Sequence, residues 1–200
     1  MQAYVGKLVA VLAFGLIVAC GPKMPNYDYS KEVDPRVSEY VVGVDDSLNI
    51  NIWKNEQLST SVVVRPDGTI TMPLVGDLVA RGKTPTQLRK EIAKRLAEYV
   101  KLGASEITVA VTQVNSYRFT VSGEVVRAGM VQSRQYLTVA DAIAQAGGFT
   151  RFAERNKITL SRRDADGTIR RIPIAYDFIE NGSHPEMNIV MLAGDSLHIP

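Results

Sequence analysis

Residues 138–148 read Thr-Val-Ala-Asp-Ala-Ile-Ala-Gln-Ala-Gly-Gly, and this stretch indicates the fold of the second half of the chain. Thr138 is a suitable helix N-cap residue, and Gly147-Gly148 form a helix stop that lets the chain reverse tightly. We therefore predict one short helix over residues 138–146. Because segments with strand patterns lie on both sides of this helix, we expect it to pack on a sheet.

Strand-like segments surround the predicted helix. In chain order they are residues 117–125, 158–162, 168–172, 188–192 and 195–199. The Asp-Gly turn at residues 164–167 joins the second and third of these segments into a predicted hairpin. A sheet that cradles one short helix is the β-grasp arrangement. We therefore predict a β-grasp-like domain over residues 116–200.

The first half of the chain has its own strand patterns. Residues 48–52 alternate Leu, Asn, Ile, Asn and Ile, which is typical of a half-buried strand. Residues 61–65 and 69–72 flank the sequence Pro66-Asp67-Gly68, and this spacing predicts a second hairpin. Residues 106–114 alternate strictly, so we expect them to pair back into the same sheet.

A capped helix is predicted between these strands. Thr84 and Gln87 match a capping box, and Pro85 suits the first helical position. One face of the helix carries Leu88, Ile92 and Leu96. We interpret its charged face as solvated and expect the helix to end at Gly103. These elements predict a first domain over residues 40–115, and hence an α+β fold with two small mixed domains.

The N-terminus has the pattern of a secretory signal. A positive start at Lys7 precedes an uncharged apolar run over residues 8–18, which is shorter than the ~20 residues of a membrane span. The boundary Ile17-Val-Ala-Cys20 resembles the lipobox of bacterial lipoproteins, whose cysteine is lipidated. This resemblance implies a lipoprotein signal peptide over residues 1–19 and lipid attachment at Cys20. An incidental cysteine behind an ordinary signal peptide is the alternative.

The segment after the cysteine is predicted to be a lipidated tether over residues 20–39. It has two prolines near its start and no sustained periodicity. Gly21, rather than an aspartate, follows the cysteine. In the sorting behaviour of similar lipoproteins, this favours the outer membrane over the inner one.

Composition excludes several classes of protein. The chain has 200 residues, of which 46% are hydrophobic and 22% charged, as in ordinary globular proteins. Its 23 basic and 21 acidic residues lack the clustered basic excess typical of nucleic-acid binding, so no nucleic-acid partner is expected. One cysteine and two histidines leave no basis for an internal disulfide or a Cys- or His-built metal site. We expect no metal and no cofactor.

No arrangement of residues predicts catalysis. His184 lies in a loop-like segment and His198 in a terminal strand, so surface or edge positions fit both better than a general base. Asp45 and Asp46 are adjacent, and adjacent residues on an extended chain point to opposite sides. Turn-forming acids before a strand therefore fit better than an acid–base pair or a calcium site.

Four arginines make the second predicted hairpin basic. They are Arg162, Arg163, Arg170 and Arg171. They could bind an anionic polymer, but solvated strand edges that discourage aggregation are the commoner explanation.

Several segments, in order and spacing, resemble known sequence motifs. In the first domain they are Tyr40–Gly43, Asp46–Trp53, Leu58–Ser59, Val64–Ile70, Pro73–Gly76 and Gly82–Pro85; in the second they are Val121–Val125, Ala128–Gly129, Leu137–Ile143, Ala146–Gly148 and Gly194–Pro200. Together they resemble the bacterial polysaccharide export family, outer-membrane lipoproteins that carry capsule or exopolysaccharide out of the cell. The second set resembles its soluble-ligand-binding β-grasp module. Where that family usually has Gly-Pro-Gly-Asp, this chain has Gly43-Val-Asp-Asp46, which we interpret as a turn variant.

The resemblance implies a function and partners. Family members form ring-shaped homo-oligomers that enclose a polymer conduit across the periplasm, and they work with an inner-membrane polysaccharide co-polymerase. Longer members repeat the β-grasp module and end in an amphipathic helix that helps form a barrel through the outer membrane. Because this sequence stops at Pro200 after one module, we expect a short form without that helix. A separate outer-membrane pore, for which a β-barrel is a candidate, would complete the path.

The expected function is therefore a component of a capsule or exopolysaccharide export machine. It would be a non-enzymatic periplasmic conduit, lipid-anchored at the periplasmic face of the outer membrane, and polar residues of the first hairpin and helix would be candidates to line it. The main alternative is a monomeric periplasmic lipoprotein that binds or senses a glycan. A glycan hydrolase is the least favoured, since it needs paired carboxylates on separate strands.

Overall fold

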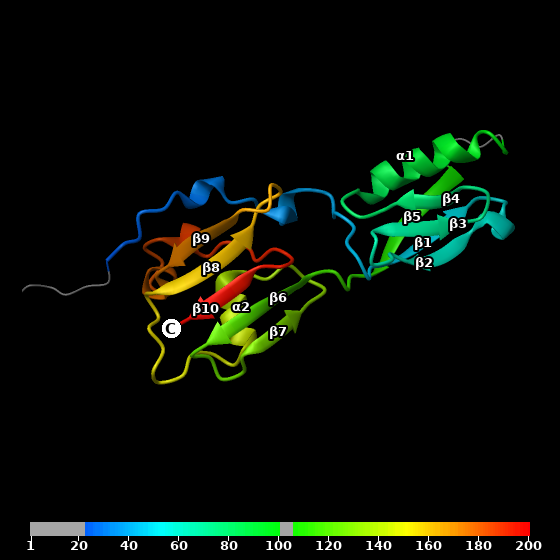
Figure 1. Cartoon of the computed structure of the whole chain (residues 1–200). Helices are drawn as coiled ribbons and strands as arrows, with labels where there is room; N and C mark the ends of the chain where they lie inside the picture. The colour runs from blue at the N-terminus through cyan, green and yellow to red at the C-terminus, as the bar shows by residue number, and fades with distance from the viewer. Residues whose placement is uncertain (1–22, 101–105) are drawn as a thin grey trace, which may run out of the picture.

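The structure is a computed structural model that describes residues 23–100 and 106–200, folded as two domains joined end to end (Figure 1). Each domain has its own buried apolar cluster. The first cluster extends from Val42 to Ile107, and the second combines Tyr29 with residues between Tyr117 and Ile199. Helices pack on sheets in both domains, so the α+β prediction is confirmed.

The first domain is built on a three-stranded antiparallel sheet in the order β2-β1-β5. Its strands are β1 (Ser47–Ile52), β2 (Thr60–Val63) and β5 (Ile107–Gln113). The inward side chains of β1 are buried, as the alternation predicted. Strand β5 pairs along the whole of β1, which confirms that residues 106–114 return to the same sheet. A short 3-10 helix, η3 (Glu56–Leu58), connects β1 to β2.

The hairpin predicted around Pro66-Asp67-Gly68 is wrong in its strand pairing. The turn does form, because the Arg65 amide donates to the Thr69 carbonyl at 2.9 Å. However, β2 pairs with β1, whereas β3 (Thr69–Met72) pairs with β4 (Gly76–Val79) in a separate two-stranded sheet. The Gly68 carbonyl accepts hydrogen bonds from the amides that follow β4, so the chain beyond the turn pairs with β4 and not with β2.

Helix α1 (Pro85–Leu96) covers the first sheet and packs on β5 (Figure 1). The predicted capping box between Thr84 and Gln87 is present in both directions. The helix ends at Leu96 and not near Gly103, which lies outside the described residues. Leu96 is the last buried residue of the apolar stripe, and its carbonyl accepts the amides of Tyr99 and Val100 in a tight turn.

The second domain has a five-stranded sheet in the order β7-β6-β10-β8-β9. The strands are β6 (Arg118–Gly123), β7 (Gly129–Gln132), β8 (Ile158–Arg163), β9 (Ile169–Ile174) and β10 (Ser196–Ile199). Strand β10 runs parallel to β6 and antiparallel to β8, so the last strand joins two antiparallel hairpins. The predicted β8–β9 hairpin is confirmed.

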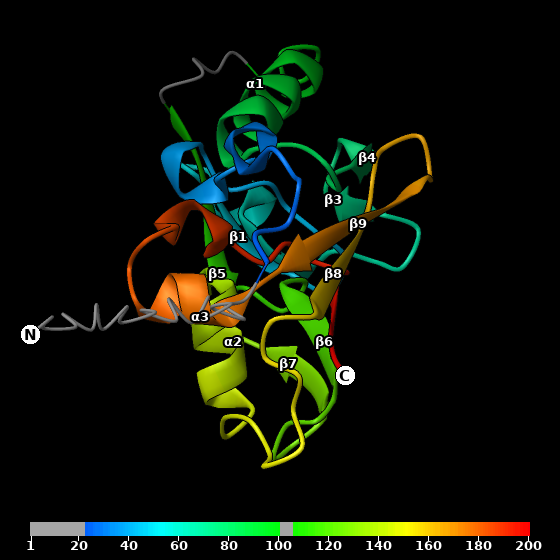
Figure 2. The same cartoon turned by 90° about the vertical axis from the view of Figure 1, so that its left-hand side faces the viewer.

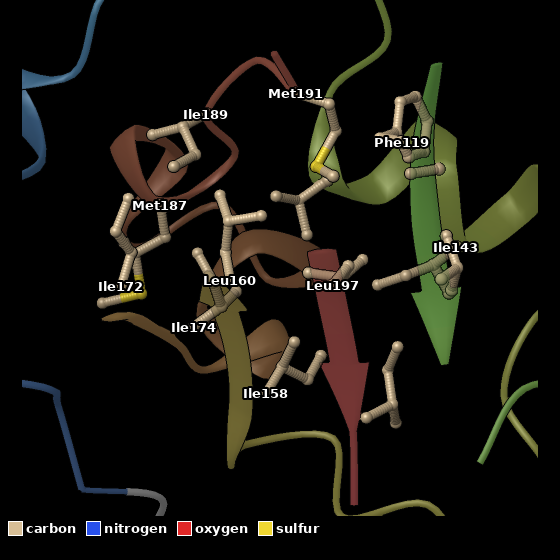
Figure 3. Packing of buried hydrophobic residues seen from close by; sticks show 14 of the residues in the cluster. Phe119, Ile143, Ile158, Leu160, Ile172, Ile174, Met187, Ile189, Met191 and Leu197 are labelled. Atoms are coloured by element: carbon tan, nitrogen blue, oxygen red, sulfur yellow. The ribbon is translucent and has the colours of Figure 1, made fainter. Parts of the chain in front are cut away.

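Residues 188–192 do not form the predicted strand. Only an isolated bridge between Thr138 and Val190 occurs there, and a 3-10 helix, η5 (Pro185–Met187), precedes it. The amide of Met191 donates to the Leu137 carbonyl at 2.8 Å. The segment thus bonds to the chain entering α2 rather than to a sheet strand, and its apolar side chains fill the core (Figure 3).

Helix α2 (Val139–Gln145) is the predicted short helix, capped by Thr138. Gly147 and Gly148 follow it with φ of +86° and +84°, a left-handed conformation that glycine adopts without strain. Ile143 of α2 points toward Phe119 and Leu197 of the sheet (Figure 3). A second short helix, α3 (Tyr176–Glu180), follows β9. This sheet with one cradled helix confirms the β-grasp-like prediction.

Among the residues that the structure describes, no helix has the length and apolar character needed to cross a membrane.

Candidate functional site

The predicted lipid-attachment residue Cys20 and the signal peptide over residues 1–19 lie outside the described residues. The structure does describe the segment that follows the cysteine, from Lys23 onward. Its first ordered elements are two 3-10 helices, η1 (Tyr29–Lys31) and η2 (Pro35–Val37).

The predicted tether over residues 20–39 is docked along part of its length. Tyr29 is 6% exposed and lies in the core of the second domain, where its hydroxyl donates to the Pro173 carbonyl of β9. The ring of Tyr27 packs beside it at 5.1 Å between centroids. A single buried tyrosine in a proline-containing segment has no periodicity, so sequence patterns could not reveal this docking.

A buried ion cluster, formed by Glu32, Arg162 and Asp195, holds the same segment. Arg162 is 3% exposed, and both carboxylate side chains are 2% exposed. Its guanidinium donates to Asp195 at 2.6 and 3.1 Å, to Glu32 at 2.7 Å and to the Val190 carbonyl at 2.8 Å. Four of the five N–H donors of the guanidinium are thus bonded, and the buried charge is paired with two carboxylates.

The interpretation of the four hairpin arginines as solvated edges is therefore wrong for two of them. Arg162 is buried, and the half-exposed Arg170 pairs with Glu32 and Asp164, each at 2.6 Å. Arg163 and Arg171 are exposed, as expected. Strand alternation turns Arg162 inward and leaves Arg163 outward. The partner of the inward arginine, Glu32, comes from the N-terminal segment, so the sequence of the hairpin alone does not show that Arg162 is paired.

Docking of the N-terminal segment should depend on pH through Glu32. Burial by itself raises the pKa of Glu32, but hydrogen bonds from Tyr27 and Arg170, with the charges of Arg162 and Arg170, outweigh it and hold the pKa below its usual range. A carboxyl with a lowered folded-state pKa adds stability that is complete above the unfolded pKa of about 4.3. That stability is lost as pH falls through the folded-state pKa.

We therefore expect the thermal midpoint of the second domain to fall more steeply below about pH 4 in the wild type than in Glu32→Gln. The variant should also unfold at lower temperature at pH 7. Glu180→Gln serves as the control, because Glu180 is 60% exposed in its pair with Arg155. Equal pH profiles for the wild type and Glu32→Gln would contradict this role.

Asp46 joins the two domains. It is fully buried, at 0% exposure. One carboxylate oxygen accepts the amides of Asn115 and Ser116 at 2.9 and 2.8 Å. The other accepts the Gly43 amide at 2.8 Å, the Tyr40 hydroxyl at 2.6 Å and the Ser116 hydroxyl at 3.0 Å. One side chain thus ties the start of the first domain to the connection between the domains.

The turn that presents Asp46 explains the departure from the family motif. Asp45 has φ of 72°, in the left-handed region where aspartate is tolerated and glycine is favoured. Its side chain forms an ion pair with Arg118 at 2.6 Å. A Cβ at Gly43 would lie 2.2 Å from the Ser116 Cβ, so this position requires glycine. The turn-forming interpretation is confirmed for these acids, but the bridging role of Asp46 was missed.

A pocket of about 650 Å³ opens beside this junction. Its walls include Tyr40, Val41, Arg81, Tyr136 and Leu192, which come from both domains. Glu39 is the only carboxylic acid among its described lining residues, whereas a glycosidase requires a carboxylate pair. The pocket can hold a ligand, but it does not offer that pair.

The structure does not bring the two histidines together. His184 pairs with Glu186 at 2.8 Å and packs on the Phe178 ring. His198 lies exposed on β10, 3.2 Å from the Ser122 hydroxyl. Neither lines the junction pocket. Within residues 23–100 and 106–200, no group of His, Cys, Asp or Glu side chains is placed to hold a metal ion.

Both larger sheets have open edges in the described structure. They are β2 and β5 in the first domain and β7 and β9 in the second. Exposed apolar side chains lie on three of these strands, namely Val63, Met130 and Ile169. An open strand edge is a template for pairing with another chain.

Comparison with known proteins defines the class. Residues 34–112 match the family model described as polysaccharide biosynthesis/export protein, and residues 118–173 match the SLBB domain. The first range covers the first domain, and the second covers the second domain from β6 into β9. The chain belongs to the polysaccharide export family. Because its members are transport components, the prediction that the chain is not an enzyme is confirmed.

Curated relatives carry the same assignment in their names. The capsule polysaccharide export outer membrane protein CtrA of Neisseria meningitidis serogroup A / serotype 4A (strain DSM 15465 / Z2491) is 34% identical over 85% of this chain and 46% of its own. The capsule polysaccharide export protein BexD of Haemophilus influenzae is 31% identical over 77% of this chain and 42% of its own. The exopolysaccharide production protein ExoF of Rhizobium meliloti (strain 1021) is 31% identical over 58% of this chain and 30% of its own. The chain spans less than half the length of these relatives.

Proposed function

We propose that this protein is a component of a capsule or exopolysaccharide export machine at the outer membrane, where it forms an oligomeric periplasmic conduit for the polymer. The observation that carries the proposal is the ordered pair of an export domain and a β-grasp-like SLBB domain. Relatives named as EPS I or capsule polysaccharide export outer membrane proteins support both the cargo and the location.

The open sheet edges support the oligomer. A ring of identical subunits needs a head-to-tail contact between two different surfaces of the chain. Edges such as β7 and β9, on opposite sides of one sheet, are different surfaces of this kind. The conduit would act passively, since a hydrated polymer slides most easily past a wall without tight binding sites.

The same proposal includes lipid attachment at Cys20 and two kinds of protein partner. The cysteine would hold the protein at the periplasmic face of the outer membrane, and two or more acyl chains are sufficient for stable anchoring. The partners would be an inner-membrane polysaccharide co-polymerase and a separate outer-membrane pore. Cross-linking in cells followed by mass spectrometry would identify both.

Deleting the gene should abolish surface polysaccharide, and complementation should require the anchor. Wild-type protein should restore the polymer, whereas Cys20→Ala should accumulate as an unprocessed precursor and fail to restore it. Because Cys20 is the only cysteine, palmitate labelling of the wild type reports on that residue alone. Lys23→Ala, three positions further along, is the control and should be labelled normally.

Two results would count against the proposal. Normal surface polysaccharide in the deletion strain would exclude the export role, and persistent palmitate labelling of Cys20→Ala would exclude the anchor. The mass of the detergent-extracted protein tests the conduit separately. A stable monomer would favour the alternative of a periplasmic glycan-binding lipoprotein, for which the junction pocket would be the binding site.

A further inference from the structure

We propose that two adjacent loops of the second domain, residues 124–128 and 147–152, form a membrane-contact tip that inserts Val126 and Phe152 among lipid head groups. The partner is an anionic phospholipid surface. The inference rests on the proposed anchoring at Cys20, which brings the chain to a membrane, but it concerns a different part of the molecule.

The two loops are locked together. The Val126 amide donates to the Gly148 carbonyl at 3.1 Å, and the Thr150 amide donates to the Glu124 carbonyl at 3.1 Å. The Thr150 hydroxyl also bonds to the Glu124 carboxylate. Because the backbones are fixed in this way, the side chains on the tip are held in place rather than exposed by loose loops.

The tip presents apolar side chains to solvent. Val126 is 62% exposed, directly after the buried Val125, and Phe152 is 68% exposed. Single exposed apolar side chains are common on protein surfaces, so it is their neighbours that distinguish these two.

Each of these apolar residues has an arginine beside it. Arg127 follows Val126 and is held by the Gln145 carbonyl at 3.1 Å. Arg151 precedes Phe152, and its guanidinium carbon lies 4.7 Å from the centre of that ring. Apolar side chains beside arginines fit a membrane interface, where the apolar groups enter the head-group boundary and the guanidinium groups bind lipid phosphates. This charge complementarity favours lipid over an uncharged protein surface.

The position of the tip agrees with the anchor. Tyr29 is fixed in the second domain, so the nine residues from Cys20 to Tyr29 allow a reach of at most about 30 Å. Figures 1 and 2 show the tip loops and the start of the described N-terminal segment at the end of the second domain that faces away from the first domain. A lipid on Cys20 therefore keeps this end near the bilayer. The tip would set the orientation of the protein, while the acyl chains supply the affinity.

A tryptophan probe tests the contact directly. Trp53, in the first domain, is the only tryptophan, so the double variant Trp53→Phe/Phe152→Trp reports on the tip alone. The lipidated full chain is reconstituted into vesicles of phosphatidylethanolamine and phosphatidylglycerol that contain brominated acyl chains. We expect a blue-shifted emission quenched about twofold or more, because interfacial side chains enter ~5–10 Å into the head-group boundary.

Control proteins and control vesicles distinguish contact through the tip from anchoring by the lipid alone. Wild-type protein, with its exposed Trp53, should float with the vesicles and remain unquenched. Adding Arg127→Gln and Arg151→Gln to the probe should reduce quenching, as should vesicles of phosphatidylcholine alone. Circular dichroism checks that the probe variant is folded. If it is not, the double variant Trp53→Phe/Val126→Trp is used as the probe instead.

Protein that floats with unquenched probe emission would overturn the tip and leave the anchor intact. Protein that does not float at all would overturn the anchor and, with it, the tip.

Discussion

Asp46→Ala is expected to lower the free energy of unfolding of the first domain by about 3–5 kcal/mol. The substitution removes the acceptor of five hydrogen bonds at a fully buried position. Three of the donors are backbone amides, at Gly43, Asn115 and Ser116, and each unsatisfied buried donor costs about 1–3 kcal/mol. Partial repair by water keeps the total below the sum of these costs.

The junction should loosen as well as the first domain. Hydrogen exchange followed by mass spectrometry should show faster exchange in peptides that cover residues 40–46 and 113–118, which the carboxylate connects. Asp45→Asn is the matched control, because asparagine tolerates the left-handed backbone and the exposed pair with Arg118 contributes less than about 1 kcal/mol. Equal exchange in Asp46→Ala and Asp45→Asn would contradict the bridging role.

Arg162→Met is expected to destabilise the second domain by about 3–5 kcal/mol. Methionine preserves much of the side-chain volume but leaves the carboxylates of Glu32 and Asp195 buried without their shared counter-charge. An uncompensated buried charge is far less favourable than a paired one. The N-terminal segment should detach more readily at the same time, because Glu32 then keeps the half-exposed Arg170 as its counter-charge and the Tyr27 hydroxyl as a donor, but loses its buried partner.

Arg163→Met provides the control one position along the same strand. Among the described residues, its exposed side chain bonds only to the Gly167 carbonyl at 3.2 Å, so the change should stay within about 0.5 kcal/mol. Urea unfolding followed by circular dichroism measures the loss, and exchange in peptides over residues 25–35 measures detachment. A similar shift in both variants would show that the ion cluster does not stabilise the domain.

Most of the elements could be predicted from the sequence, because their signals are local. The capping box of Thr84 and Gln87 and the helix over residues 139–145 lie where the patterns placed them. The errors occur where a partner is remote. An Asp-Gly turn specifies that the chain reverses, but it does not specify whether β3 pairs with β2 or with β4. Residues 188–192 look like a strand by composition, yet their backbone bonds to the segment before α2.

The candidate site was less predictable than the fold. The resemblance to polysaccharide export proteins came from ordered motifs, and the matched family models support it. The junction did not follow from those motifs. Asp45 and Asp46 look alike in the sequence, but one is an exposed turn residue paired with Arg118, and the other is the buried acceptor between the domains.

The sequence by itself determined the two-domain α+β organisation, the caps, most of the turns and the family. Each of these depends on residues a few positions apart or on an ordered series of short motifs. Only the tertiary structure decided what holds the parts together. Asp46 reaches Ser116 across 70 positions, and Arg162 reaches Glu32 across 130. Contacts over such separations leave no periodicity in the chain, because they arise only after folding has buried both partners and made their pairing favourable.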